Sequence, residues 1–290
     1  MIQGWNYNYF TDKFKYIPEK IHAVCIGTTQ AHFAFDFSMY DVQGFNMAVW
    51  LNYFTYSKLL LEKYKNKIAD QAVIFITLQY PIFLCDKNSS LTIDNALQYS
   101  KILFGKDPEA SFMKQCIYRI LPDCCFSQEN FSGIRNIESR NKKVNHYKIW
   151  ELEQMTESVI NAWEKETNCN AFRYHLGSIT RYHQTKMQNS INDVVEIINL
   201  CRKNQWIPVL TALPFSKIMN DRISEKFKKY YFYQCIEKIV EKTNCLWLDY
   251  SWDKRLEDIN YYMDVWWLNE RGRKRFTGIV LEEYERFSNP

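Results

Sequence analysis

Several features that would assign a chain to a functional class at once are missing from this sequence. Its 9 cysteines include no CxxC pair, and the vicinal pair Cys124-Cys125 has neither zinc-ligand spacing nor a histidine cluster nearby. We therefore expect no metal and no cofactor. The cysteines are explained most simply as buried free thiols in a reducing compartment, which favours a cytoplasmic location.

Two further absences concern charge and hydrophobic length. The 37 basic and 33 acidic residues leave a net charge of +4, and no strongly basic stretch occurs, so we expect no nucleic-acid partner. The longest apolar runs are strand-sized and are broken by Gln, Thr or Pro, and residues 1–6 show no signal-peptide pattern. The sequence thus predicts no membrane insertion.

What the chain does contain is enough apolar material for a full core. Of its 290 residues, 47% are hydrophobic and 17% are aromatic, which suits one large domain over residues 1–290. Aromatic rings can line a carbohydrate-binding groove, but packing inside the core is the simpler interpretation of this composition.

Short apolar runs alternate with amphipathic stretches along the chain. The runs predict buried strands, and the stretches predict helices. Such alternation requires parallel pairing with crossover connections, and hence a three-layer α/β sandwich around a central parallel sheet. Residues 84–181 are less regular, and we interpret them as a large insertion or cap. The predicted strands are 23–26, 39–42, 72–78, 206–213 and 245–249, and the predicted helices are 47–66, 190–204, 226–243 and 272–287.

Polar and small residues follow the ends of several predicted strands. In open α/β sheets, ligands bind beyond the carboxyl ends of the strands, so these residues are the candidates for a site. In chain order they are Gly27, Thr28, Thr29, Asn46, Gln79, Asp264 and Trp267.

Three segments of the chain resemble motifs of the SGNH (GDSL-type) hydrolase superfamily. The likeness is to the branch associated with bacterial surface-polysaccharide and teichoic-acid modification. The segments are Gly27-Thr28-Thr29, Phe45-Asn46-Met47-Ala48 and Asp264-Val265-Trp266-Trp267-Leu268-Asn269-Glu270-Arg271-Gly272. The resemblance implies a flavodoxin-like sandwich. It also implies that Thr29 stands at the nucleophile position, that Asn46 and Ala48 lie where an oxyanion would be bound, and that Asp264 belongs to the catalytic set. The family's oxyanion asparagine after the third strand has no clear match in this chain, and Gln79 is the nearest amide.

Two departures from the family pattern change the expected chemistry. Thr29 replaces a serine, and its extra methyl group crowds the approach to a substrate. Trp267 replaces the histidine base, and indole accepts no proton near neutral pH. A hydroxyl without a base is not activated, and Asp264 has no imidazole to orient. We therefore expect a weak or non-catalytic relative in cell-surface glycan assembly that binds a glycan, an acylated small molecule or a protein partner.

Two kinds of alternative remain open. The first is an active esterase or O-acyltransferase in which Thr29 works with a histidine from elsewhere, such as His32, His175 or His183. The second is purely structural: the Thr28-Thr29 turn and Asn46 can cap helices, Asp264 can cap its own loop, and Trp267 can serve packing.

Overall fold

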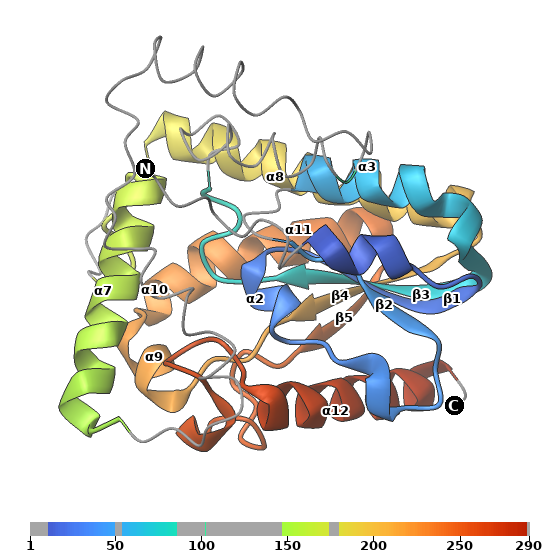
Figure 1. The fold of residues 1–290 in the computed structure, drawn as a ribbon. Helices are drawn as coiled ribbons and strands as arrows, with labels where there is room; N and C mark the ends of the chain where they lie inside the picture. Colours follow the sequence, from blue (N-terminus) through green and yellow to red (C-terminus); the bar gives the residue numbers. More distant parts are fainter. Residues whose placement is uncertain (1–10, 50–53, 86–101, 103–146, 174–179, 289–290) are drawn as a thin grey trace, which may run out of the picture.

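The computed structural model describes residues 11–49, 54–85, 102, 147–173 and 180–288. The centre of this part is a five-stranded sheet in which every strand runs parallel to its neighbours (Figure 1). The order is β2-β1-β3-β4-β5, as in flavodoxin-like sheets, and the chain changes direction across the sheet between β1 and β3. The strands are β1 (Ile21–Ile26), β2 (Gly44–Asn46), β3 (Ile68–Leu78), β4 (Ile207–Ala212) and β5 (Leu246–Asp249).

Helices cover both faces of the sheet because successive side chains of each buried strand point to opposite faces. On β3, Ile74 and Ile76 join one hydrophobic core, and Val73 and Phe75 join the other. The three-layer α/β sandwich predicted from the sequence is confirmed (Figure 1). The first face carries α3 (Phe54–Tyr64), α8 (Arg181–Lys203) and α11 (Gln234–Thr243), and the second carries α12 (Glu270–Ser288).

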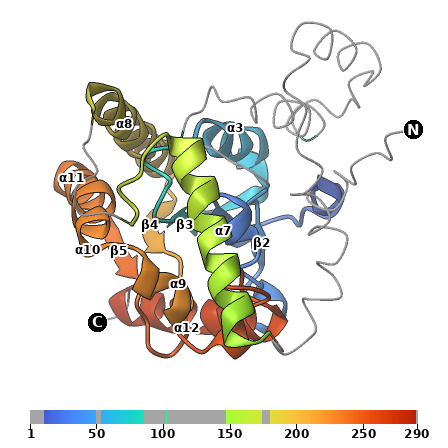
Figure 2. The same cartoon turned by 90° about the vertical axis from the view of Figure 1, so that its left-hand side faces the viewer.

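One long helix belongs to neither layer. α7 (Ile149–Thr167) runs across the end of the sheet at which the strands finish, and α9 (Lys217–Arg222), which follows β4, lies against it (Figure 2). The buried residues of α7 form a single stripe: Leu152, Thr156, Ile160, Trp163 and Thr167. The carboxyl edge of the sheet, where the candidate residues are expected, therefore lies under a helix.

Short helical segments occupy several connections. α10 continues directly into a π-helical segment, η6, and then into α11, so the predicted helix 226–243 is one rod with a π-helical segment in its first half. The short segments are η1 (Asp12–Tyr16), α2 (Thr29–His32), η2 (Phe37–Met39), η3 (Lys65–Lys67), α10 (Glu225–Phe227), η6 (Lys228–Tyr233) and η7 (Ile259–Tyr261).

The prediction of a strand at residues 39–42 is wrong. Phe37–Met39 forms the 3-10 helix η2, whose first turn is capped by the Asp36 side chain, and the strand lies further on, at Gly44–Asn46. A glycine is needed at position 44 because a Cβ atom there would overlap the Phe37 ring. The tight contact between η2 and β2 thus sets where pairing with β1 begins.

The prediction of a helix over residues 47–66 is wrong at its start. Residues 47–49 are not helical, and the Met47 amide donates to the Cys25 carbonyl oxygen at 2.8 Å, so the chain still follows β1. Within the described residues the helix is α3, Phe54–Tyr64, and residues 50–53 lie outside the described part.

Most of the segment 84–181 also lies outside the described residues, so its interpretation as an insertion or cap stays a prediction. Its described portion includes α7. None of the helices that the structure describes has both the length and the apolar character needed to cross a bilayer.

Candidate functional site

The turn after β1 lies at the point where the sheet changes direction. Gly27 has a φ of +148°, and a Cβ atom there would overlap the hydroxyl oxygen of Thr77 on β3. That hydroxyl donates to the Ile26 carbonyl oxygen at 2.8 Å. Glycine is therefore required for the close approach of this turn to β3. The structure thus places the tip of the turn between the ends of β1 and β3.

Thr28 and Gln79 meet at this point. The Thr28 hydroxyl donates to Gln79 Oε1 at 3.0 Å, which joins the ends of β1 and β3. Thr28 occupies the N-cap position of α2, but its side chain makes no capping hydrogen bond. Thr29, the first residue of α2, is buried, with 5% of its surface exposed. Two of the predicted residues are thus in direct contact, and the third lies beside them below the surface.

Asn46 holds together the segments that follow β1 and β2. Its amide nitrogen lies 3.0 Å from the Ala31 carbonyl oxygen and 3.2 Å from that of Phe35. Its amide oxygen accepts from the Ala48 backbone N–H at 2.9 Å. The Asn46 amide and the Ala48 amide, both expected near an oxyanion, therefore bind protein groups in this structure.

Asp264 organises its own loop. One carboxylate oxygen accepts from the backbone N–H groups of Trp266 and Trp267, each at 2.9 Å. This local pattern is the kind of side-chain-to-backbone bonding that aspartate commonly makes in turns. These bonds hold the backbone of the loop at Trp266 and Trp267.

The terminal loop, residues 262–269 ahead of α12, packs against α2. The segment that follows β1 and the segment that precedes the last helix therefore do lie together. The Trp267 ring stacks on Trp266, with 5.3 Å between centroids, and lies 5.3 Å from the ring of Phe33. Gln30 donates to the Pro214 carbonyl oxygen at 3.1 Å and lies 3.4 Å from that of Trp266. The position of the expected base is therefore filled by a ring that belongs to an aromatic stack.

A tryptophan of α7 extends this stack over the sheet edge. Trp163 is 4% exposed, and its ring centroid lies 5.4 Å from Trp266, 5.6 Å from Phe172 and 6.1 Å from Phe215. Sequence reasoning missed this residue because α7 was not predicted. The signal was present in the spacing of its apolar and threonine residues, which recur every three or four positions.

A buried polar network, also missed, ties together the ends of β3, β4 and β5. Asn220 accepts from the Tyr80 hydroxyl at 3.0 Å and donates to the Ser251 carbonyl oxygen at 2.7 Å. The Lys228 ammonium group donates to the Asn220 carbonyl oxygen at 3.0 Å and lies 3.7 Å from the centre of the Trp252 ring. Burial lowers the pKa of Lys228, and the ion pair with Glu225 opposes that change. The network fixes three strand exits relative to one another.

The two described histidines considered as substitute bases are both engaged. His183 Nδ1 lies 2.9 Å from the Thr180 hydroxyl, and Nε2 lies 3.0 Å from the Asn168 carbonyl oxygen, so this ring joins the end of α7 to the start of α8. His32 Nδ1 lies 3.1 Å from Lys13 Nζ. The same Nδ1 lies 3.3 Å from the Ala48 carbonyl oxygen, which also accepts from Lys13 Nζ. His175 lies outside the described residues.

Burial controls the protonation of Lys13 and His32. It lowers the pKa of the Lys13 side chain to about 7, and it lowers the pKa of His32 well below 6.5, with the nearby Lys13 charge as a second cause. His32 is therefore neutral at pH 7. Among the residues that the structure describes, no group of three His, Cys, Asp or Glu side chains could hold a metal ion.

Comparisons with known proteins add no family to this description. No protein-family model matches the chain, and a search of curated proteins gave no match.

Proposed function

We propose that the protein is a non-catalytic relative of SGNH hydrolases that acts as a binding protein in bacterial cell-surface glycan assembly. The observation that carries the proposal is the position of Trp267. It stands where the family motif has its base, and its ring contacts the rings of both Phe33 and Trp266. The sheet order and the contact between α2 and the terminal loop support the relationship, because an SGNH site is built from those two segments.

The other polar groups support loss of catalysis. A hydroxyl nucleophile needs a base, and an oxyanion needs free donors. Here the Thr28 hydroxyl donates to Gln79, and the Ala48 amide donates to Asn46. The Asp264 carboxylate accepts from two amides of its own loop. The Ala48 amide, the Gln79 side chain and the Asp264 carboxylate therefore bind other protein groups, and Thr29, at the expected nucleophile position, is buried. The link to glycan assembly rests on the motif resemblance.

Hydrolysis of p-nitrophenyl acetate tests the proposal. We expect the wild-type protein to release p-nitrophenol no faster than the Thr29→Ala variant, because Trp267 occupies the position of the family's base and its indole accepts no proton near neutral pH. Turnover that depends on Thr29 would contradict the proposal and support the alternative, an esterase or O-acyltransferase. The two proteins should have matching circular dichroism spectra.

A converse variant tests the relationship itself. If Trp267 stands at the histidine position of an SGNH site, then Trp267→His combined with Thr29→Ser should produce ester hydrolysis. That activity should be lost again when Asp264→Ala is added, because the carboxylate would orient the new imidazole. A folded double variant that stays inactive would count against the assignment to this superfamily.

A further inference from the structure

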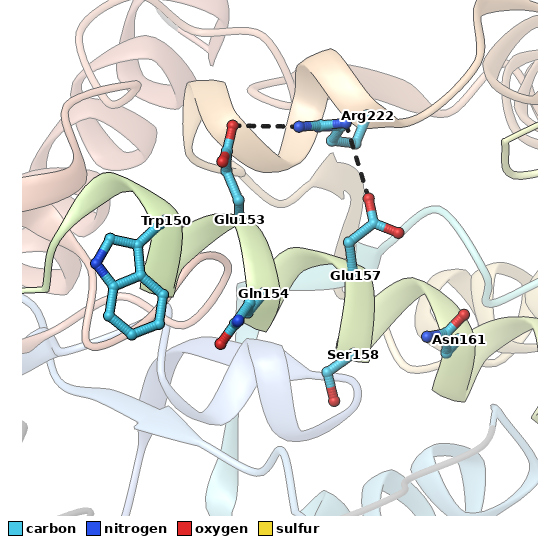
Figure 3. A pocket seen from close by; sticks show the side chains of 7 residues that line it. All are labelled: Trp150, Glu153, Gln154, Glu157, Ser158, Asn161 and Arg222. Carbon is cyan, nitrogen blue, oxygen red and sulfur yellow. Dashed lines mark hydrogen bonds and ion pairs between the residues drawn. The ribbon is translucent and has the colours of Figure 1, made fainter.

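The outer face of α7 forms an open groove with α9, away from the aromatic stack on its inner face. Its volume is about 650 Å³. The groove is lined by Trp150, Glu153, Gln154, Glu157, Ser158 and Asn161 of α7 and by Arg222 of α9 (Figure 3). No candidate residue from the sequence analysis lies in it.

An exposed tryptophan stands at one end of the groove. Trp150 lies in the first turn of α7, and 53% of its surface is exposed. A large aromatic ring left in contact with water is a flat apolar surface that a ligand can cover. Such rings bind ligands that have one flat apolar face and a polar rim.

Arginines hold the acidic side chains of the groove in place. Arg222 lies 3.2 Å from the Glu153 carboxylate and 3.9 Å from that of Glu157 (Figure 3). Arg173 lies 3.0 Å from the Glu157 carboxylate and donates to the Asn161 amide oxygen at 2.6 Å. Arg173 also lies 3.9 Å from the Glu164 carboxylate, so these three glutamates and two arginines leave a net charge of about −1. The groove therefore does not suit an anionic ligand, and the pairing of its carboxylates with arginines leaves little attraction for a cation.

The remaining lining groups are suited to hydroxyls. Gln154, Ser158 and Asn161 follow one another at helical spacing, so their side chains share one face of α7. Amide and hydroxyl groups both donate and accept, as sugar hydroxyls do. The opposite face of α7 is packed through Ile160 and Trp163, so these groups stand on an anchored helix.

We propose that this groove binds a neutral saccharide, with one sugar ring on Trp150 and the hydroxyls of the next rings on Gln154, Ser158 and the arginine-held carboxylates. The inference goes beyond the proposed function and does not rest on it. It concerns a surface of α7, whereas the former catalytic position lies under the other side of that helix.

Calorimetric titration of the full chain with maltotriose and with triacetylchitotriose, at millimolar concentrations, tests the inference. We expect at least one of these trisaccharides to bind. Trp150→Ala should weaken that binding by about tenfold or more, because the stacked ring surface is lost. Gln154→Ala should weaken it by about threefold, because a hydrogen bond is lost. Both side chains are exposed, so the variants should fold normally.

Phe287→Ala is the matched control, because Phe287 is an aromatic residue on α12 with 60% of its surface exposed. Its binding should equal that of the wild type. Failure of both trisaccharides to bind, or binding that Trp150→Ala leaves unchanged, would overturn the inference. The ester assay is independent of this result, so failure here is distinguishable from failure of the proposed function.

Discussion

Replacing Lys13 by methionine is expected to remove a strong pH dependence from the stability of the protein. Lys13 lies in η1, with Nζ 2.5 Å from the Ala48 carbonyl oxygen and 3.1 Å from His32 Nδ1. Its neighbours also include the buried thiol of Cys25. Methionine has a similar length and no charge, so the substitution removes the ammonium group with little change in packing.

The magnitude follows from the pKa of Lys13 in the two states. Burial lowers this pKa from 10.5 to about 7 in the folded protein. Between these two pH values the unfolded chain binds a proton that the folded chain does not, so the free energy of unfolding rises with pH. The rise is about 1.4 kcal/mol per pH unit and reaches at most about 5 kcal/mol. Below pH 7 Lys13 is charged in both the folded and the unfolded protein, so the free energy of unfolding is lowered by the full cost of burying that charge.

Urea unfolding, followed by circular dichroism at several pH values from 7 to 10.5, measures this effect. We expect Lys13→Met to be more stable than the wild type at pH 7, and the advantage to fall steadily as pH rises. The two groups whose pKa the Lys13 charge affects, His32 and Cys25, are kept uncharged by burial over this range, so the other titrating groups cancel in the difference. Lys15→Met is the control, because Lys15 is an exposed lysine of the same short helix. Parallel stability curves for Lys13→Met and the wild type would refute the reasoning.

Two further substitutions test the turn after β1 and the structural role of the Asn46 hydrogen bonds. Gly27→Ala should lower the free energy of unfolding by about 3 kcal/mol or more, because the new side chain would have a positive φ and would overlap Thr77. A loss below about 0.5 kcal/mol in urea unfolding would contradict this account. Asn46→Ala should cost about 2 kcal/mol or more, since it leaves the Ala48 amide without its acceptor. A melting temperature equal to that of the wild type would show that Asn46 is not a structural clamp.

The strands could be predicted because buried parallel strands are nearly continuous apolar runs. The predicted runs 23–26, 72–78, 206–213 and 245–249 correspond to β1, β3, β4 and β5. The second strand could not be placed in this way, since Gly44–Asn46 is only 3 residues long and its position depends on the contact with Phe37. α7 escaped prediction because two of its five buried positions are threonines, Thr156 and Thr167, whose hydroxyls donate to carbonyls one turn back.

The candidate site divides in the same way. That Thr28 and Gln79 lie together follows from strand order, because carboxyl ends of parallel strands meet at one edge. The partners of Asn46 and Asp264 are backbone groups, and a sequence pattern does not distinguish a side chain that binds its own loop from one that faces a ligand. The edge-to-face contact of Trp163 with Trp266 joins residues about a hundred positions apart and leaves no local trace in the sequence.

The two-sided character of α7 has a consequence for how a ligand would be received. Its inner stripe is locked by Trp163 against the rings beneath it, so the outer stripe cannot shift without breaking that packing. A ligand that binds the outer face of α7 would thus meet a preformed surface. Little binding free energy would be spent on ordering the protein. In such an arrangement one face of α7 covers the end of the sheet, and the opposite face of the same helix is held in position to contact a ligand.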